Sequence, residues 1–321
     1  MSKETKATGR VVKSTGSWYQ VELPKTGETI QARIRGKFRL GGKKLTNPVA
    51  VGDWVEMNID TAENTGMIIN ILERKNFVVR QSPRQKHHLH LMAANIDLAL
   101  LIVTVVEPKL KQGFIDRFLL LTEPRDIPVL ICFNKCDLYS EEDLLIAEYL
   151  SSLYREIGYD SLIVSATKKI KTDQLKLKLK GKTTLVTGQS GVGKSTLLNT
   201  LQSGLNIKTG DLSDYTGKGQ HTTTFAELHK LDENTHIIDT PGIKTLSYNN
   251  LEVMDVTHNF REFFQVSDRC RFNNCSHRNE PGCAVKEAVE KGSISELRYQ
   301  NYLIILDEIE DQNYWERHTD Y

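Results

Sequence analysis

The sequence lacks any long hydrophobic run. The apolar stretch ALLIVTVV at residues 99–106 has the length of a buried strand and is too short to cross a bilayer. The first ten residues, MSKETKATGR, contain no apolar segment of the kind that a signal peptide carries. The five cysteines are an odd number with three of them clustered, which argues against a secreted disulfide framework. These absences predict a cytoplasmic protein without a membrane partner.

The chain also carries almost no net charge, with a formal value of +1 over 321 residues, so total charge does not indicate nucleic-acid binding. The charges are nevertheless unevenly distributed. Residues 1–48 hold eleven Lys and Arg against three Glu, whereas the last fifteen residues hold six acids against Arg317. This asymmetry indicates a basic N-terminal arm that binds a partner. Binding through residues 33–44 should then weaken as salt rises.

The N-terminal part has little helical periodicity. Short segments that alternate polar and apolar residues, such as WYQVEL at 18–23, DWVEMNI at 53–59 and GMIINIL at 66–72, are typical of strands. A β-domain of this size with basic loops predicts an OB-type barrel at residues 1–80. Two interpretations stay open here, since the barrel can bind RNA or only pack against its neighbour.

Residues 81–248 alternate strand and helix patterns, which predicts a doubly wound, mainly parallel sheet with its ligand site at the carboxyl ends of the strands. The expected strands are 95–106, 127–137, 161–167, 183–188, 223–231 and 235–240. Amphipathic patterns predict helices at 114–123 and 140–158, the second opened by a Ser with acids in its first turn. Residues 172–182 have Leu at every second position, but their place between strands favours a short helix.

A phosphate-binding loop lies between the expected strand at 183–188 and the helix that follows. The segment GQSGVGKS matches G-x-x-x-x-G-K-[ST], whose glycines let backbone N–H groups approach phosphates at a helix N-terminus. Lys194 can reach the β and γ phosphates, and Ser195 can ligate Mg²⁺. The predicted nucleotide-binding residues of this segment are Gly188, Gln189, Ser190, Gly191, Val192, Gly193, Lys194, Ser195 and Thr196.

A guanine-reading motif, NKCD, follows the expected strand at 127–137. Asp137 can accept hydrogen bonds from guanine N1–H and the 2-amino group, a combination that adenine does not offer. Asn134 would support both the phosphate loop and the base edge, and the aliphatic stem of Lys135 would cover the ring face. Cys136 occupies the variable position of the motif and is assigned no chemistry.

Two further elements complete the expected site. The segment SAT follows the third strand, and there Ser165 and the backbone N–H of Ala166 would meet the base, the latter at guanine O6. The segment DTPG follows THIID, and its Asp239 would hold Mg²⁺ through water while the Gly242 N–H meets the γ-phosphate. The four motifs support one another as the parts of one guanine-nucleotide site.

The Gly-rich segment GKGQHTTT, which ends at Thr224, is expected to be the first switch of a GTPase. Thr223 is the predicted Mg²⁺ ligand, with Thr222 and Thr224 as alternatives, and a simple strand start is the other interpretation of these threonines. Ile243 occupies the position where many GTPases carry a water-orienting Gln. His221 is therefore a candidate to orient the water or act as a base, although it can equally be an ordinary surface histidine.

These motifs occur in an unusual order, because the base-reading motif precedes the phosphate loop. Reading from 183 to 242 and then from 95 to 180 restores the order of an ordinary GTPase. The order indicates a circular permutation, which is physically tolerable because the natural termini of a domain often lie close together.

The last part, residues 249–321, is expected to be mainly helical and to bind zinc. The segment RCRFNNCSHRNEPGC brings together Cys270, Cys275, His277 and Cys283, which match a structural Cys₃His site with all four positions filled. The alternative is a set of unlinked cysteines beside a surface histidine.

The permuted order NKCD, SAT, GQSGVGKS, HTTT and DTPG, with the basic barrel before it and the C-x₄-C-x-H-x₅-C cluster after it, resembles the ribosome small-subunit-dependent GTPase A (RsgA) family across essentially the whole chain. The resemblance implies an OB-fold, a permuted GTPase domain and a C-terminal zinc domain. It also implies GTP and GDP as ligands, the small ribosomal subunit and its rRNA as partner, and subunit-stimulated GTP hydrolysis coupled to release during late subunit maturation. A monomer is expected.

Two other function classes remain possible on the residues alone. A P-loop enzyme that uses ATP would not depend on Asp137 for its choice of nucleotide. A nucleotide-signalled RNA-binding regulator with negligible turnover is consistent with Ile243. The segment 79–97 contains His87, His88 and His90, which are read as a basic linker, with a second metal site as the alternative.

Overall fold

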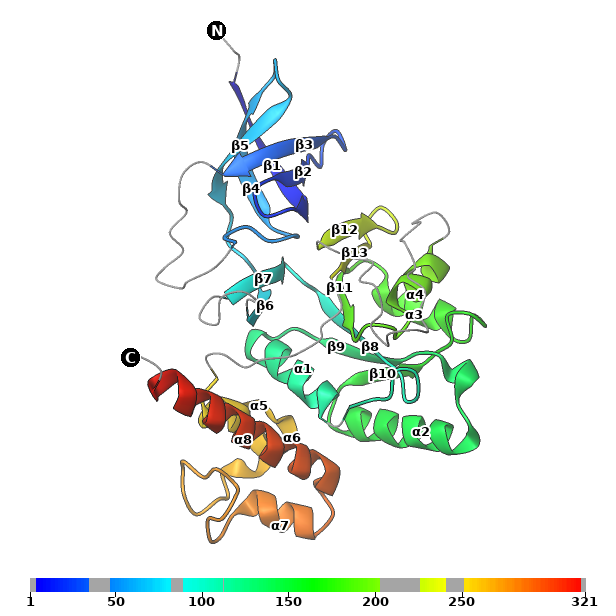
Figure 1. Cartoon of the computed structure of the whole chain (residues 1–321), viewed down its shortest axis with the longest axis vertical. Helices are drawn as coiled ribbons and strands as arrows, with labels where there is room; N and C mark the ends of the chain where they lie inside the picture. Colours follow the sequence, from blue (N-terminus) through cyan, green and yellow to red (C-terminus); the bar gives the residue numbers. More distant parts are fainter. Residues whose placement is uncertain are drawn as a thin grey trace.

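The computed structural model describes residues 4–34, 47–81, 89–111, 113–202, 226–240 and 251–318. They form three successive parts, a β-barrel, a central α/β domain and a helical C-terminal module, with the α/β domain in contact with both others (Figure 1). Within these ranges no helix combines the length and the apolarity needed to span a membrane.

The N-terminal part is a five-stranded barrel, as expected from the alternating sequence. Its strands are β1 (Glu4–Ser14), β2 (Tyr19–Glu22), β3 (Thr29–Ile34), β4 (Trp54–Asp60) and β5 (Thr65–Ile71). The long β1 pairs antiparallel with both β2 and β4, and β3 pairs parallel with β5, which closes the barrel. The side chains that fill it come from alternate positions: Val11, Tyr19, Val21, Ile30, Ala32, Val49, Val55, Met57, Ile59 and Ile68.

A separate hairpin connects the barrel to the central domain. It consists of β6 (Phe77–Gln81) and β7 (Leu89–Ala94), which pair antiparallel with each other. The division expected between residues 80 and 81 falls inside β6. The Asn76 side chain fixes the base of the hairpin, because it donates to the Ile96 carbonyl and accepts from the Ile96 N–H, both at 2.8 Å.

The central domain is a mainly parallel sheet with helices on both faces, as predicted. Its strands are β8 (Leu98–Val103), β9 (Val129–Phe133), β10 (Asp160–Ile163), β11 (Thr183–Gly188), β12 (Glu227–Lys230) and β13 (His236–Asp239). They lie in the order β10-β9-β8-β11-β13-β12, with only β12 antiparallel to its neighbour within this group. The two chain segments that the permutation exchanges therefore meet where β11, the strand before the phosphate loop, pairs with β8.

The helices of this domain begin close to where the sequence predicts them. They are α1 (Phe114–Thr122), α2 (Glu141–Glu156), α3 (Thr172–Leu179) and α4 (Lys194–Leu201), with the short 3₁₀ turns η1 (Glu123–Arg125) and η2 (Cys136–Leu138). A capping box opens α2, since the Ser140 hydroxyl accepts from the Asp143 N–H and the Asp143 carboxylate accepts from the Ser140 N–H. Apolar residues of α1 and α2 pack on one sheet face and those of α3 and α4 on the other.

The barrel and the central sheet form one continuous sheet, which the sequence patterns did not predict. The barrel strand β1 pairs antiparallel with β12 at the register Lys13↔Glu227. The Lys13 ammonium lies 2.8 Å from the Glu227 carboxylate. Nearby, the Arg10 guanidinium donates to the Thr183 hydroxyl of β11 at 2.8 Å. The barrel therefore rests on the edge strand that leads from the expected first switch.

The C-terminal module contains α5 (Val253–Asn259), α6 (Arg261–Ser267), α7 (Ala284–Glu290) and the long α8 (Glu296–His318). Its apolar core includes Leu120 of α1, so the module packs directly on the central domain. In Figure 1, α8 runs beside α1 on the side away from the barrel. The predicted mainly helical character of this part is confirmed.

Candidate functional site

The nucleotide site lies where the parallel strands of the central sheet end. NKCD follows β9, SAT follows β10, the phosphate loop follows β11, and Asp239 is the last residue of β13. Because neighbouring parallel strands end at the same edge, motifs that are far apart in the sequence meet there. The structure thus brings together the elements that the sequence predicts for a guanine-nucleotide site.

The phosphate loop turns sharply from β11 into α4. Gly193 precedes the helix with φ 87°, and a Cβ atom at this position would lie 2.6 Å from Nδ2 of Asn134, so only glycine fits. The Lys194 ammonium donates to the carbonyls of Gly188 and Gln189, at 3.1 and 2.9 Å. Burial lowers the pKa of Lys194 to about 8, with Asp239 acting in the opposite direction. A bound polyphosphate would place further negative charge beside the Lys194 ammonium and so favour its protonated form.

Asn134 of NKCD connects its own motif to the phosphate loop and to SAT. Its Nδ2 donates to the Val192 carbonyl of the phosphate loop at 2.9 Å. Its Oδ1 accepts from the Ala166 N–H at 3.2 Å, so this N–H, expected to face guanine O6, is paired with Asn134 here. The side chain is 1% exposed. The predicted support of the phosphate loop by Asn134 agrees with the Val192 contact, while its support of the base edge stays a prediction.

Asp137 is held at the surface end of the site by hydroxyl groups. Its carboxylate accepts from Ser165 at 2.5 Å and from Thr167 at 3.0 Å, and the Ser165 hydrogen bond is the main reason why its pKa is lowered. The Lys135 ammonium donates to the Glu107 carbonyl at 2.8 Å, and the end of its aliphatic stem lies near Gly193 of the phosphate loop. Cys136 begins η2 and has no polar role in these contacts.

Sequence reasoning missed two residues that support this region. Thr167, the last residue of SAT, binds the second carboxylate oxygen of Asp137, and its place in the motif was a usable signal. The Tyr139 hydroxyl donates to the Asn134 carbonyl at 2.7 Å and accepts from the Val105 N–H at 3.1 Å. No pattern in the sequence points to Tyr139, because it acts on backbone atoms of two different strand ends.

The remaining predicted residues divide into two groups. Asp239 is 2% exposed beside β11, and Ser190, Gly191, Ser195 and Thr196 lie in the loop and the first turn of α4. The other predicted residues lie outside the described part of the chain: His221, Thr222, Thr223, Thr224, Gly242 and Ile243. His87 and His88 also lie outside it.

The cysteine cluster converges as the sequence predicts. The ligand atoms of Cys270, Cys275, His277 and Cys283 all lie within 4.8 Å of one another. The His277 ring faces the sulfurs with Nδ1, 3.7 Å from Sγ of Cys270 and 3.4 Å from Sγ of Cys283. Burial lowers the pKa of His277, which favours the neutral imidazole that a metal binds. Three sulfurs and one nitrogen at this spacing can hold a metal ion.

Hydrogen bonds from residues other than the four ligands fix the loop at residues 270–283, and the sequence did not indicate them. The Glu280 carboxylate accepts from the Ser276 N–H and hydroxyl, each at 2.7 Å, and from the Arg278 N–H at 3.0 Å. Partial burial works to raise the pKa of Glu280, but these hydrogen bonds lower it to about 2. From α8, the Tyr299 hydroxyl donates to the His277 carbonyl at 2.7 Å. The loop is therefore shaped by groups other than its metal ligands.

Comparison with family models finds matches over most of the chain. A model described as RsgA GTPase matches residues 71–249, and one described as RsgA N-terminal domain matches residues 8–68. A protein of Phocaeicola vulgatus named small ribosomal subunit biogenesis GTPase RsgA is 47% identical over 306 residues, covering 95% of this chain and 98% of the relative. A protein of the same name from Flavobacterium johnsoniae is 45% identical, with coverages of 94% and 93%.

Two solved structures share the fold. The crystal structure of YjeQ from Thermotoga maritima matches with a TM-score of 0.75 and 37% identity, covering 95% of this chain and 98% of that one. A structure of YloQ, described as a circularly permuted GTPase, matches with a TM-score of 0.72 and 30% identity over 96% of each chain. The permuted arrangement predicted from the motif order is thus shared with a solved structure.

Proposed function

This chain belongs to the RsgA family of GTPases, and on that premise we propose that it binds the small ribosomal subunit and hydrolyses GTP during late maturation of that subunit. In this proposal the subunit stimulates hydrolysis, and hydrolysis is coupled to release of the protein. The relatives named above are small ribosomal subunit biogenesis GTPases and cover nearly the whole chain, which supports the same role here.

The observation that carries the GTPase part is the placement of Asn134. One buried side chain holds the phosphate loop through Val192 and the segment after β10 through Ala166. An adenine-specific P-loop enzyme has no need for this connection or for a carboxylate at position 137. We infer that Asp137 accepts from guanine N1–H and the 2-amino group, while Lys194 and the loop N–H groups bind the phosphates.

Two metal ions complete the proposal. Mg²⁺ would accompany GTP, held by Ser195, by Thr223 and by Asp239 through water. Zn²⁺ would be bound by Cys270, Cys275, His277 and Cys283, whose ligand atoms lie within 4.8 Å of one another. A closed set of four ligands leaves no position for substrate, so the role of the zinc ion is structural. Its contribution is to fix the fold of the C-terminal module.

For hydrolysis, His221 would orient the attacking water, because Ile243 stands where many GTPases carry a Gln. Slow turnover in the absence of a partner follows from that substitution, since an apolar side chain cannot position water. The test is His221→Ala, assayed with the subunit present. A strong loss of turnover with unchanged GTP affinity supports the role, and unchanged turnover excludes it.

The first experiment is GTP turnover at fixed salt, measured alone and with purified small or large ribosomal subunits. Strong stimulation by the small subunit alone is expected. A lack of stimulation by either subunit would leave the guanine-nucleotide site intact and remove the proposed partner. It would also favour the nucleotide-signalled RNA-binding regulator, the candidate that Ile243 supports.

Nucleotide choice is tested with Asp137→Asn. The variant should lose affinity for GTP and gain affinity for xanthosine triphosphate, because xanthine presents a C2 carbonyl to the new amide N–H where guanine presents its amino group. ATP affinity serves as the control and should stay low in both proteins. Unchanged nucleotide choice would point instead to an ATP-dependent P-loop enzyme.

We further propose that the chain acts in the cytoplasm as a monomer. Its functional parts would be residues 1–80 for ribosome and RNA binding, 81–248 for GTP and 249–321 for zinc. The basic character of residues 1–48 supports an electrostatic contact with rRNA.

A further inference from the structure

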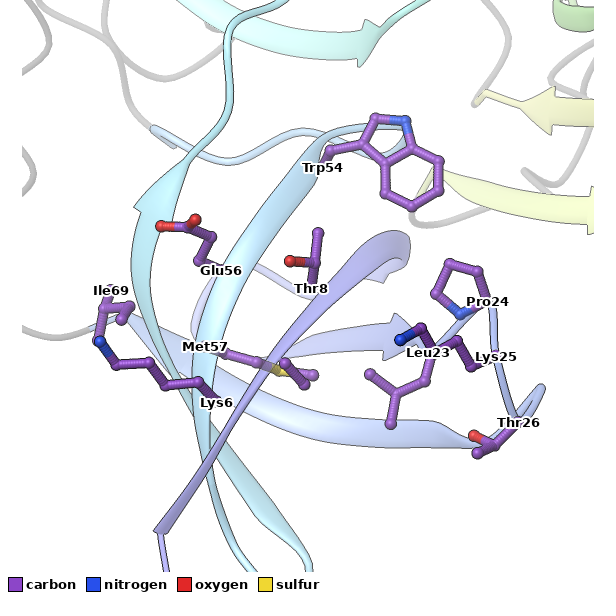
Figure 2. A pocket seen from close by; sticks show the side chains of 11 residues that line it. Lys6, Thr8, Leu23, Pro24, Lys25, Thr26, Trp54, Glu56, Met57 and Ile69 are labelled. Atoms are coloured by element: carbon purple, nitrogen blue, oxygen red, sulfur yellow. The ribbon is translucent and has the colours of Figure 1, made fainter.

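An open groove of about 560 Å³ lies on the outer side of the barrel (Figure 2). It is formed by β1, β4, β5 and the turn between β2 and β3. The residues that line it include Lys6 and Thr8 of β1, Trp54 and Glu56 of β4, and Lys25 of the turn. Its volume is in the range of small-ligand sites, about 300–1,000 Å³.

The strand register explains why polar and aromatic groups face this groove. In β1 and β4, alternate residues point outward, and the pairing places Thr8 opposite Glu56 and Arg10 opposite Trp54. The intervening residues of β4 are turned into the barrel core, where Met57 is fully buried. In Figure 2, Trp54 lies at one end, and the turn that carries Lys25 lies across the groove from Glu56.

The groove combines an aromatic ring with an excess of positive charge. The Arg10 guanidinium lies 5.8 Å from the centre of the Trp54 ring. Lys6 and Lys25 line the groove and form no ion pair with any other residue that the structure describes. Glu56 is the only acid in the lining, and its carboxylate accepts from the Asn70 amide at 3.1 Å.

We propose that this groove binds one unpaired nucleotide of an RNA strand. The base stacks on Trp54 and donates an exocyclic or ring N–H to Glu56, while the flanking phosphates contact Lys6 and Lys25. A basic peptide would be repelled by the two lysines, and a neutral apolar ligand would leave them without counter-charge. The choice of RNA over DNA rests on the proposed function, whereas stacking on Trp54 does not.

The groove is distinct from the face through which OB barrels usually bind nucleic acid. That face is formed by strands 2 and 3 with the loops between strands 1 and 2 and between strands 4 and 5. Here it contains a separate depression lined by Lys13, Thr15, Trp18, Gln20, Gln31 and Thr65. None of these residues lines the proposed groove. Arg10, which lies over Trp54, also bonds to Thr183 of the GTPase domain, so a base on Trp54 lies close to the joint between the domains.

The test uses the full chain with Trp18 and Trp315 replaced by Phe, so that Trp54 is the only tryptophan. A single-stranded RNA of about eight nucleotides, a length that an OB-type barrel can accommodate, is titrated at low salt. Saturable quenching of Trp54 fluorescence that follows the binding curve from anisotropy is expected. RNA binding without a change in Trp54 fluorescence would overturn the proposal, as would equal quenching by poly-glutamate.

Substitutions in the natural chain give an independent measurement. Trp54→Leu should weaken RNA binding by about 5- to 150-fold, the range for loss of one stacked base, and Trp54→Phe should retain most of the affinity. The double variant Lys6→Gln, Lys25→Gln should reduce the slope of log affinity against log salt by about 0.7 per lysine. Equal affinities of Trp54→Leu and the natural protein would overturn the proposal.

The test of the groove can fail or succeed independently of the test of the proposed function, because it measures RNA binding in the absence of GTP. Stimulation of GTP turnover by the small subunit without Trp54 quenching would uphold the function and overturn the groove. Quenching without stimulation would uphold the groove and overturn the function.

Discussion

The C-terminal module contacts the GTPase domain through a buried cluster of charges, whereas the barrel contacts it through a strand edge, exposed ion pairs and the apolar side chains of Val12 and Val51. At the C-terminal joint, the side chains of Arg298 and Asp116 are 2% and 0% exposed and lie 2.5 Å apart. At the barrel joint, Lys13 and Glu227 are 31% and 38% exposed at 2.8 Å. An ion pair is therefore buried where the C-terminal module meets the GTPase domain and exposed where the barrel meets it, so the two pairs should contribute differently to stability.

The contact between the C-terminal module and the GTPase domain is a buried polar network centred on Asp116 and Arg298. The Asp116 carboxylate accepts from Arg298, from the Tyr154 hydroxyl and from the Asn301 amide, each at 2.5 Å. The Arg298 guanidinium also binds Glu262 at 2.6 and 3.0 Å. Burial works to lower the pKa of Arg298, but Asp116 and Glu262 hold it well above its ordinary value. Separating these groups would leave a charge without a partner in an apolar region, so the joint resists opening.

Arg74 and Asp53 form a buried ion pair at the base of the barrel, but no buried ion pair that the structure describes joins the barrel to the central sheet. Lys75 and Asp97, a second pair near this joint, are 67% and 40% exposed at 3.0 Å. Exposed pairs contribute little to stability because water and salt screen both charges. We therefore expect the barrel to change position more easily than the C-terminal module. The strand that it pairs with, β12, leads from the expected first switch toward Asp239.

Removing the metal should have the largest effect on stability, and it should destabilise the C-terminal module without destabilising the barrel. A chelator, or Cys275→Ser, should unfold the C-terminal module, since structural zinc contributes about 10–16 kcal/mol in zinc-finger peptides. Hydrogen exchange resolved by segment is the measurement: residues 251–310 should lose protection while residues 4–71 keep it. Cys136→Ser is the matched control, because this cysteine lies outside the cluster. Equal loss of protection in the barrel would contradict the independence of the two joints.

Arg298→Ala should cause the second largest loss of stability. It leaves the buried Asp116 carboxylate without its cation, and the free energy of unfolding should fall by about 3–5 kcal/mol. Urea unfolding followed by near-UV circular dichroism measures the change. Lys291→Ala provides the control within the same module, since its helical pair with Glu287 is exposed and should contribute less than about 1 kcal/mol. Similar losses in the two variants would show that burial does not distinguish these ion pairs.

Much of the site was predictable from the sequence because its motifs are local. A strand followed by GQSGVGKS fixes both the turn and the residues that face phosphate, and the motif order alone indicated the permutation. The contact of Asn134 with the phosphate loop was also expected from the motif, whereas its bond with the Ala166 N–H was not, because that N–H was expected to meet guanine O6. The expected helices and the parallel sheet followed from periodicity in the same way.

The two joints were not predictable, because each depends on side chains far apart in the sequence. Arg298 and Asp116 are separated by 182 positions, and neither lies in a motif. A charged residue such as Arg298 in α8 is expected at the surface from the sequence, although it is 1% exposed. The pairing of β1 with β12 depends on which sheet edges remain open after folding, and strand periodicity carries no information on that choice.

The nucleotide site between the joints should show a proton linkage of intermediate size. Burial lowers the pKa of Lys194 to about 8, and bound phosphates should raise it again. GTP affinity should therefore be constant below about pH 8 and fall by up to about tenfold per pH unit above it, as binding takes up a proton. Calorimetry in buffers of different ionisation enthalpy measures this uptake. Lys194→Arg should abolish it, because the guanidinium stays protonated, and the same uptake in that variant would assign the proton to another group.

The smallest effect is expected for the ion pair at the barrel joint. Lys13→Ala and Glu227→Ala should each change the free energy of unfolding by less than about 1 kcal/mol, and the coupling energy from a double-mutant cycle should be about 0.2–1 kcal/mol. The exchanged pair, Lys13→Glu with Glu227→Lys, should restore the natural stability, because the register places the two residues opposite each other. A coupling energy near that of the Arg298 cluster would mean that the barrel is fixed as firmly as the C-terminal module. Barrel motion would then require β12 itself to move, and exchange of the β12 amides would have to differ between the GDP-bound and GTP-analogue-bound protein.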